Sequence, residues 1–171
     1  MRLGYARQLV QTVERVVARL EHLPTGTLTR RPGPGRWSIK EIVGHLVDSA
    51  SNNHQRFVRA RWQKDLIFPT YDQEGWVVAQ EYQEAPWPEL LALWRTYNLH
   101  LARVMDTTPD VLRLREHRRH NFDQVAFRSI PPDQPATLDY FMRDYVEHLE
   151  HHVRQIEELL PASGKDSQPR P

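Results

Sequence analysis

The residues of this sequence best suited to chemistry are two histidines near its C-terminal end. His148 and His152 are four residues apart, which places both imidazoles on one helix face, so one nitrogen of each can approach the same ion. They also fall between Tyr145 and Ile156 on an apolar stripe, where a histidine without a hydrogen-bonding partner is costly. The pattern favours a metal site, and hydrogen-bonded core histidines are the alternative.

A third histidine, His45, lies between Ile42 and Leu46 near the buried edge of an earlier predicted helix. Three neutral imidazoles without an obligatory carboxylate suit zinc or nickel better than magnesium or calcium. Three protein ligands also leave one coordination position for water or substrate, which is typical of a catalytic ion. We therefore predict one divalent transition metal per chain, zinc or nickel, bound by His45, His148 and His152. The neighbouring His151 is expected to turn toward the flank of its helix.

Polar side chains accompany both predicted ligand helices. Three of them follow His45 at intervals of three, seven and eleven residues, and one precedes His148 by a helical turn. Such residues could orient the second nitrogen of a ligand or bind substrate, and a solvated helix edge is the alternative. The candidate catalytic residues are Asp48, Asn52, Arg56 and Asp144. Solvated or helix-capping roles are expected for His22, His100, His117 and His120.

Apolar residues at intervals of three and four predict the long helices that would position these side chains. The predicted helices span residues 3–23 and 39–63, a stretch from Pro88 past Val104, and residues 138–159. The second begins with a capping box, Ser38-Ile39-Lys40-Glu41. Residues 64–86 form a crossover in which 72–83 could be a short helix, and for 107–135 two short strands and an irregular loop both stay open.

Four amphipathic helices with one long crossover predict an all-α fold, a four-helix bundle. The hydrophobic fraction of 39% and the charged fraction of 26% are near globular averages, so the body of the chain should fold. We assign residues 1–160 to a single domain and residues 161–171 to a polar, disordered C-terminal tail.

Composition excludes several classes of function. The chain has no cysteine, which removes disulfides, thiolate ligands and a cysteine nucleophile. Its net charge of +1 supplies no field to recruit nucleic acid or an anionic membrane. No apolar run approaches the roughly 20 residues of a membrane span, and the N-terminus lacks the apolar block of a signal peptide. A cytoplasmic location is therefore expected.

Three segments together resemble the DinB-like superfamily and, within it, the YfiT-like group of metal-dependent hydrolases. They are Trp37 to Ser49, which includes His45; Tyr71 to Trp76; and Tyr145 to His152. The resemblance implies an up-down-down-up bundle, nickel or zinc on the three matching histidines, and a homodimer. It also implies kinship with transferases that join small thiols such as bacillithiol to electrophiles. It implies no catalytic base.

These observations lead us to expect an enzyme in which the metal activates a nucleophile. S-transfer of a small thiol to an electrophile is the leading expectation, partly because no HExxH arrangement is present for a peptidase-type reaction. The alternatives are hydrolysis by metal-bound water and a non-catalytic metal-binding stress-response protein. Carboxylates of a thiol such as bacillithiol could meet Arg56 or the basic stretch 113–119, which could also alter the site entrance. That stretch lacks interleaved aromatics, so nucleic-acid binding is not expected.

Overall fold

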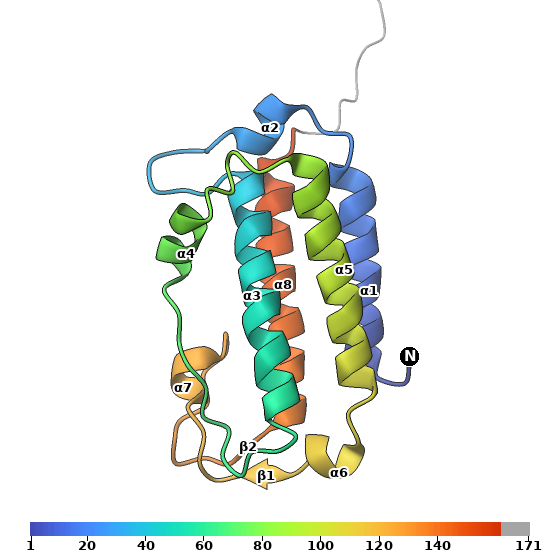
Figure 1. Ribbon diagram of the computed structural model, residues 1–171, viewed down its shortest axis with the longest axis vertical. Coiled ribbons are helices and arrows are strands. Elements are labelled where there is room, and N and C mark those ends of the chain that lie inside the picture. The colour runs from blue at the N-terminus through green and yellow to red at the C-terminus, as the bar shows by residue number, and fades with distance from the viewer. Residues whose placement is uncertain (162–171) are drawn as a thin grey trace, which may run out of the picture.

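The molecule is built from four long helices and their connections. A computed structural model describes residues 1–161. The long helices are α1 (Gly4–Leu20), α3 (Ile39–Arg59), α5 (Trp87–Asp106) and α8 (Leu138–Leu159). In Figure 1, α1 and α8 run upward and α3 and α5 run downward, so the predicted up-down-down-up bundle is confirmed. The tail predicted for 161–171 lies outside the described residues, except for Pro161.

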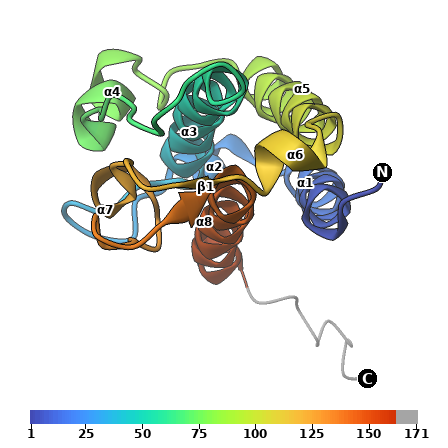
Figure 2. The ribbon, with the colours of Figure 1, turned by 90° about the horizontal axis from the view of Figure 1, so that it is seen from below.

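The helices form a ring in the order α1, α5, α3 and α8, as the view along the bundle in Figure 2 shows. Each helix turns its apolar stripe inward, and the largest fully buried side chains include Trp94 on α5 and Tyr145 on α8. Because α3 packs against α2 and α4 as well as against α5 and α8, its N-terminal half is enclosed, and every residue from Ile39 to Ala50 is buried. None of the helices within residues 1–161 has the length and apolar character needed to cross a membrane.

The start of α3 is fixed by the capping box that the sequence predicts. The Ser38 hydroxyl accepts a hydrogen bond from the Glu41 amide at 3.3 Å, and the Glu41 carboxylate accepts one from the Ser38 amide at 2.9 Å. The same hydroxyl donates to Gln83 Oε1 at 2.7 Å, so the cap also holds the end of the crossover. These bonds set the rotation of α3 and therefore the direction in which His45 points.

Several predicted boundaries were too long. Helix α1 ends at Leu20 rather than 23, because Pro24 is the N-cap of the short helix α2 (Thr25–Thr29). Helix α3 ends at Arg59 rather than 63, and the crossover helix α4 (Gln73–Ala79) is shorter than 72–83.

The connection between α5 and α8 contains both helical and extended pieces. It includes α6 (Asp110–Arg113), β1 (Glu116–His117), α7 (Phe122–Val125) and β2 (Ala136–Thr137), with β1 and β2 paired antiparallel. Backbone bonds join it to the crossover, where the Leu66 amide donates to the Arg119 carbonyl at 2.9 Å. Asn121 clamps the two segments by bonding both the amide and the carbonyl of Phe68.

Two histidines of this connection are buried, although solvated or capping roles were expected. His117 and His120 are 4% and 7% exposed, and each bonds a backbone carbonyl, of Lys64 and Gln134 respectively. The solvated role is wrong for both, because long-range contacts, which local sequence does not reveal, cover the two rings. His120 Nδ1 also accepts the Phe122 amide at the start of α7 at 3.2 Å, a contact of the capping kind. His22 and His100 are exposed as expected, with His100 Nε2 lying 3.3 Å from His54 Nε2.

Candidate metal centre

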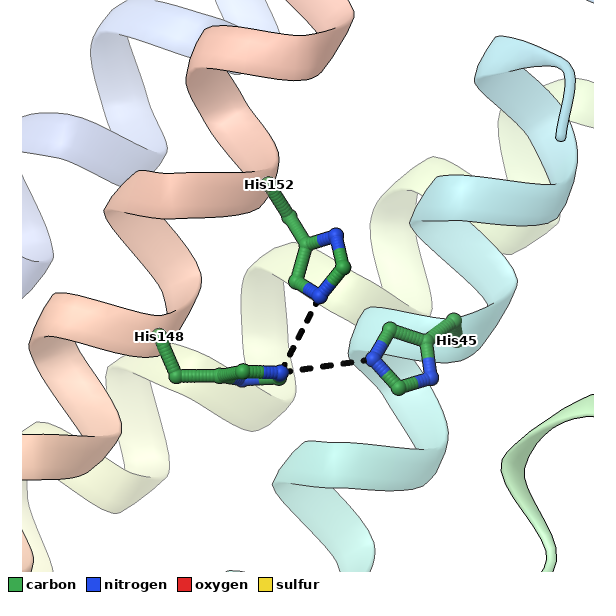
Figure 3. Close-up of side chains that lie close together, drawn as sticks. All are labelled: His45, His148 and His152. Atoms are coloured by element: carbon green, nitrogen blue, oxygen red, sulfur yellow. Dashed lines mark hydrogen bonds between the residues drawn. The ribbon is translucent and has the colours of Figure 1, made fainter. Parts of the chain in front are cut away.

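The structure brings the three predicted histidines together. His45 on α3 faces His148 and His152 on α8, and the Nε2 atoms of all three rings point toward one another (Figure 3). His148 Nε2 lies 3.4 Å from His45 Nε2 and 3.0 Å from His152 Nε2. Zinc–nitrogen bonds of about 2.0–2.1 Å in tetrahedral geometry require nitrogens about 3.3 Å apart. The spacing of these atoms therefore fits one divalent transition metal.

The opposite ring nitrogens are held in two of the three cases. His152 Nδ1 lies 2.8 Å from Gln155 Oε1, an acceptor, so the proton is on Nδ1 and the Nε2 lone pair is free. His148 Nδ1 lies 3.4 Å from the Ser49 hydroxyl. His45 Nδ1 is buried and has no hydrogen-bond partner among the described residues. His152 is thus preset in the tautomer that metal binding needs, whereas the Ser49 hydroxyl can donate or accept and so bonds either tautomer of His148.

Burial keeps these rings neutral. It lowers the pKa of His45 to about 3 and the pKa of His152 to about 4, and it lowers that of His148 well below its ordinary value. Repulsion among the neighbouring rings acts in the same direction for all three. Because only neutral imidazole offers a lone pair to a metal, the site favours the ligating form at neutral pH.

His151 is not one of the three histidines whose nitrogens could meet at one ion, as expected. Its Nε2 accepts a hydrogen bond from Gln155 Nε2 at 3.1 Å, and Gln155 in turn accepts from His152. His151 therefore supports a ligand through Gln155, a residue that sequence reasoning missed. Gln155 follows His152 by three residues, and this spacing was the signal in the sequence, because residues three apart are neighbours on a helix.

Trp37, immediately before the α3 cap, covers one side of the cluster. Its ring centroid lies 5.0 Å from that of His45 and 6.5 Å from that of His152. It also lines a cavity of about 220 Å³ that reaches His152 and Gln155. The aromatic ring thus shields His45 from water while leaving His152 accessible.

A larger cavity of about 360 Å³ opens beside His148 and His152. Helices α3 and α8 form two of its walls. The crossover and residues 124–127, at the end of α7 and just after it (the α7 segment), close it. Its lining includes Ser49, Asn53, Arg56, Thr70, Tyr71, Gln73, Gln124, Val125, Ala126, Phe127, Asp144, Tyr145, His148, His151 and His152. The α7 segment, which the sequence left without a role, therefore forms part of a binding pocket.

Two of the four candidate catalytic residues line this cavity. Arg56 is 6% exposed and donates to the Pro69 carbonyl at 2.9 Å. Asp144 accepts bonds from the Phe127 and Arg128 amides at 2.8 and 2.6 Å, so it secures the α7 wall. Burial raises the pKa of Asp144 and lowers that of Arg56.

The other two candidates do not reach the cavity. The Asn52 side chain bonds the Asp48 carbonyl, and Asp48 Oδ1 accepts from Gln80 and Tyr82 of the crossover. The polar face of α3 beside the histidines is instead formed by Ser49 and Asn53. The sequence carried a signal for both, because they follow His45 at intervals of four and eight.

The basic stretch 113–119 does not border the entrance, contrary to expectation. Arg113 is buried against Asp139, with which it forms an ion pair, and Arg119 pairs with Asp65 at 3.1 Å. Arg115 donates to His117 and to the Gln63 carbonyl. None of the residues 113–119 lines the cavity beside the histidines.

Comparison with known proteins gives the arrangement a family. YfiT of Bacillus subtilis (strain 168), named as a candidate metal-dependent hydrolase, is 25% identical over 159 residues, which cover 91% of this chain and 84% of that protein. A Bacillus pumilus (strain SAFR-032) protein with the same description is 26% identical over 154 residues, or 90% and 81% of the two chains. The solved structure of Bacillus subtilis YfiT, described as an unusual four-helix bundle, superposes with a TM-score of 0.70 at 23% identity, covering 90% of this chain and 85% of that one. The sequence profile of the DinB superfamily matches residues 8–156, and the chain belongs to this superfamily.

Proposed function

We propose that the chain is a metal-dependent transferase that joins a small thiol to an electrophile, with His45, His148 and His152 as metal ligands. The observation that supports this proposal best is the larger cavity. It gives access to His148 and His152 and contains the buried guanidinium of Arg56, but it has no carboxylate free to act as a base. A bound divalent metal supplies Lewis acidity, which lowers the pKa of a thiol or water at its open position.

The lack of a free carboxylate in the larger cavity favours S-transfer over hydrolysis, while the carboxylates near the metal site on the other side, Glu74 and Glu158, line the smaller cavity. Asp144 is the one acidic side chain that lines the larger cavity, and both of its oxygens already accept backbone hydrogen bonds. Hydrolysis by activated water generally uses a positioned base to remove a proton. In S-transfer the thiol loses its proton to solvent, and its sulfur bonds to the electrophilic carbon as the leaving group departs with its electron pair.

Arg56 gives the cavity a preference for an anionic reactant. Within residues 1–161 it forms no ion pair with a carboxylate, and a guanidinium stays charged even when burial lowers its pKa. Its planar fork matches a carboxylate. A thiol that carries carboxylates, as bacillithiol does, therefore suits this cavity. Both cavities reach His152, which fits a reaction between two small molecules.

Hydrolysis by activated water is the second candidate, and the names of the Bacillus relatives favour it. A non-catalytic metal-binding role is the third. One experiment separates the three: zinc- or nickel-loaded protein is mixed with a small thiol and monochlorobimane, and in parallel with ester and amide substrates.

We expect the loaded protein to accelerate thiol transfer beyond the rate with free metal. The acceleration should be greatest near neutral pH and decline above about 9, where a thiol with pKa near 8.5 ionises without help. His45→Ala should abolish it. Ester or amide cleavage without thiol transfer would establish the hydrolase, and neither activity would leave the non-catalytic role.

A matched thiol pair tests the part assigned to Arg56. Mercaptopropionate carries a carboxylate where mercaptoethanol carries a hydroxyl group. The wild type should have the lower KM for mercaptopropionate. Arg56→Met should remove this preference while leaving the amount of bound zinc unchanged. An unchanged preference in the variant would refute the anion-binding role.

A further inference from the structure

Two buried atoms on one face of α3 lack hydrogen-bond partners among the described residues, and they are chemically complementary. One is His45 Nδ1 and the other is Asp48 Oδ2, each with almost no exposed surface. The two residues are three apart on the same helix, where side chains are neighbours. A ligand that uses Nε2 must carry its proton on Nδ1, which makes Nδ1 a donor that requires an acceptor.

Asp48 is held in place from outside the helix. Its Oδ1 accepts hydrogen bonds from Tyr82 Oη at 2.7 Å and from Gln80 Nε2 at 2.8 Å. The Tyr82 ring packs closely against α3 where Gly44 has no side chain, since a Cβ there would meet ring carbons at 2.1 to 2.7 Å. The clamp formed by Gln80 and Tyr82 uses only one oxygen and leaves the second oxygen available to α3.

We infer that Asp48 is the positioning residue for His45, accepting the Nδ1 proton so that Nε2 points at the metal. The inference rests on the proposed three-histidine site, but not on what that site catalyses. The two atoms are not hydrogen-bonded in the structure, so the inferred bond requires a movement of one of the two side chains. Figure 3 shows the other ring nitrogen of His45 facing away from His148 and His152, which leaves Nδ1 to a partner outside the cluster.

A second aspartate near the ligands provides a contrast. Asp144 precedes His148 by one turn, and its two oxygens each accept a backbone amide, so neither is left for an imidazole. His148 and His152 instead have neutral partners, Ser49 and Gln155. Asp48 would therefore give His45 the one charge-assisted hydrogen bond of the three ligands.

Asp48→Asn tests the inference by zinc affinity, measured by competition with a chromophoric chelator. The asparagine oxygen still accepts from Tyr82 and Gln80, but its amide donates toward His45 and favours the tautomer whose Nε2 carries the proton. We expect zinc to bind 10- to 100-fold more weakly, while the melting temperature of the metal-free form changes little. Asp144→Asn is the matched control. Because Asp144 bonds no metal ligand, this variant should bind zinc within about twofold of the wild type, without the 10- to 100-fold loss expected for a residue that orients a ligand.

A wild-type measurement keeps the test independent of the variant's folding. In the zinc-loaded protein, the Nδ1 proton of His45 should resonate downfield of those of His148 and His152, because charge-assisted bonds are shorter and stronger. Equal zinc affinity of Asp48→Asn and wild type would overturn the role of Asp48, as would a His45 proton that is not downfield of the other two. Failure of the wild type to bind zinc would instead refute the underlying metal site.

Discussion

At the scale of single residues, the adjacent His151 and His152 have different roles: His152 is a predicted metal ligand, and His151 supports it through Gln155. His152 contributes Nε2 to the cluster, whereas His151 bonds Gln155 and packs against the rings of Phe127 and His152. We predict that His148→Ala and His152→Ala abolish stoichiometric zinc or nickel binding, because two remaining imidazoles cannot enclose the ion. His151→Ala should keep close to one metal per chain, with affinity reduced by up to about tenfold through Gln155.

Elemental analysis after chelator-free purification measures this difference. His100→Ala is the control, since His100 and His54 form an exposed two-histidine contact that could add weakly bound metal. Loss of metal in His151→Ala with retention in His152→Ala would show that the wrong neighbour was chosen. Wild-type protein without a transition metal would contradict the site altogether.

The sequence predicted the histidine cluster more fully than its polar surroundings. A spacing of four on an apolar stripe determines that His148 and His152 share a face. For residues around His45, however, helical periodicity allows either flank of α3 to face the site. The position of α8 decides the matter: Ser49 and Asn53 face the cavity, and Asp48 faces the crossover. That choice depends on packing between helices that are far apart in the sequence, so the spacing from His45 alone could not predict it.

At the scale of elements, the contact between Gly44 of α3 and Tyr82 of the crossover fixes how α4 sits on the bundle. Gly44→Ala would gain about 0.5–1 kcal/mol of helix stability but place a methyl group inside the Tyr82 ring. Overpacking of this kind costs about 1–3 kcal/mol, so we predict a net loss of up to about 2.5 kcal/mol. Chemical denaturation followed by circular dichroism measures it.

Gly4→Ala is the matched control, because the added methyl group at the start of α1 would meet no described atom within 4 Å apart from its chain neighbours and its own helix backbone. It should leave stability unchanged or raise it slightly. Combining Gly44→Ala with Tyr82→Ala should remove the clash, so that the two costs do not add. A stable Gly44→Ala single variant would mean that Tyr82 is not confined to this position.

The elements differ in how well their sequences foretold them. The four long helices follow from continuous apolar stripes, and α3 also from its capping box. The connection from 107 to 137 has no such period, and its shape depends on distant groups such as Asn121, which bridges to Phe68. Consequently its role as a cavity wall, through Gln124 to Phe127, could not be predicted.

At the scale of the whole molecule, a metal between α3 and α8 adds to a fold that the apolar core already stabilises. Binding only to the folded state contributes about 2.7 kcal/mol at a hundredfold excess over the dissociation constant. We predict that the metal-free protein stays helical, with a lower melting temperature than the loaded form. Circular dichroism with and without chelator is the measurement, and a random-coil spectrum of the metal-free form would make the ion structural.

The three buried imidazoles also make the stability of the metal-free molecule depend on pH. Their pKa values in the fold are depressed, to about 3 for His45 and about 4 for His152, whereas those of the unfolded chain are near 6.5. As pH falls below about 6.5, the unfolded state takes up protons that the folded state does not, so stability decreases. Asp48 and Asp144, whose pKa values burial raises, act in the opposite direction, but only nearer the ordinary carboxyl range.

We therefore predict that the free energy of unfolding in chelator declines between pH 7 and pH 5, by up to about 4 kcal/mol per pH unit if all three histidines contribute. Denaturant titrations at several pH values measure the slope. His148→Gln removes one titrating ring and should reduce the slope by about a third, the share of one proton in three. A stability that is flat over this range, or that rises as pH falls, would show that the folded state accepts the protons, and the rings would then not be held neutral as a group.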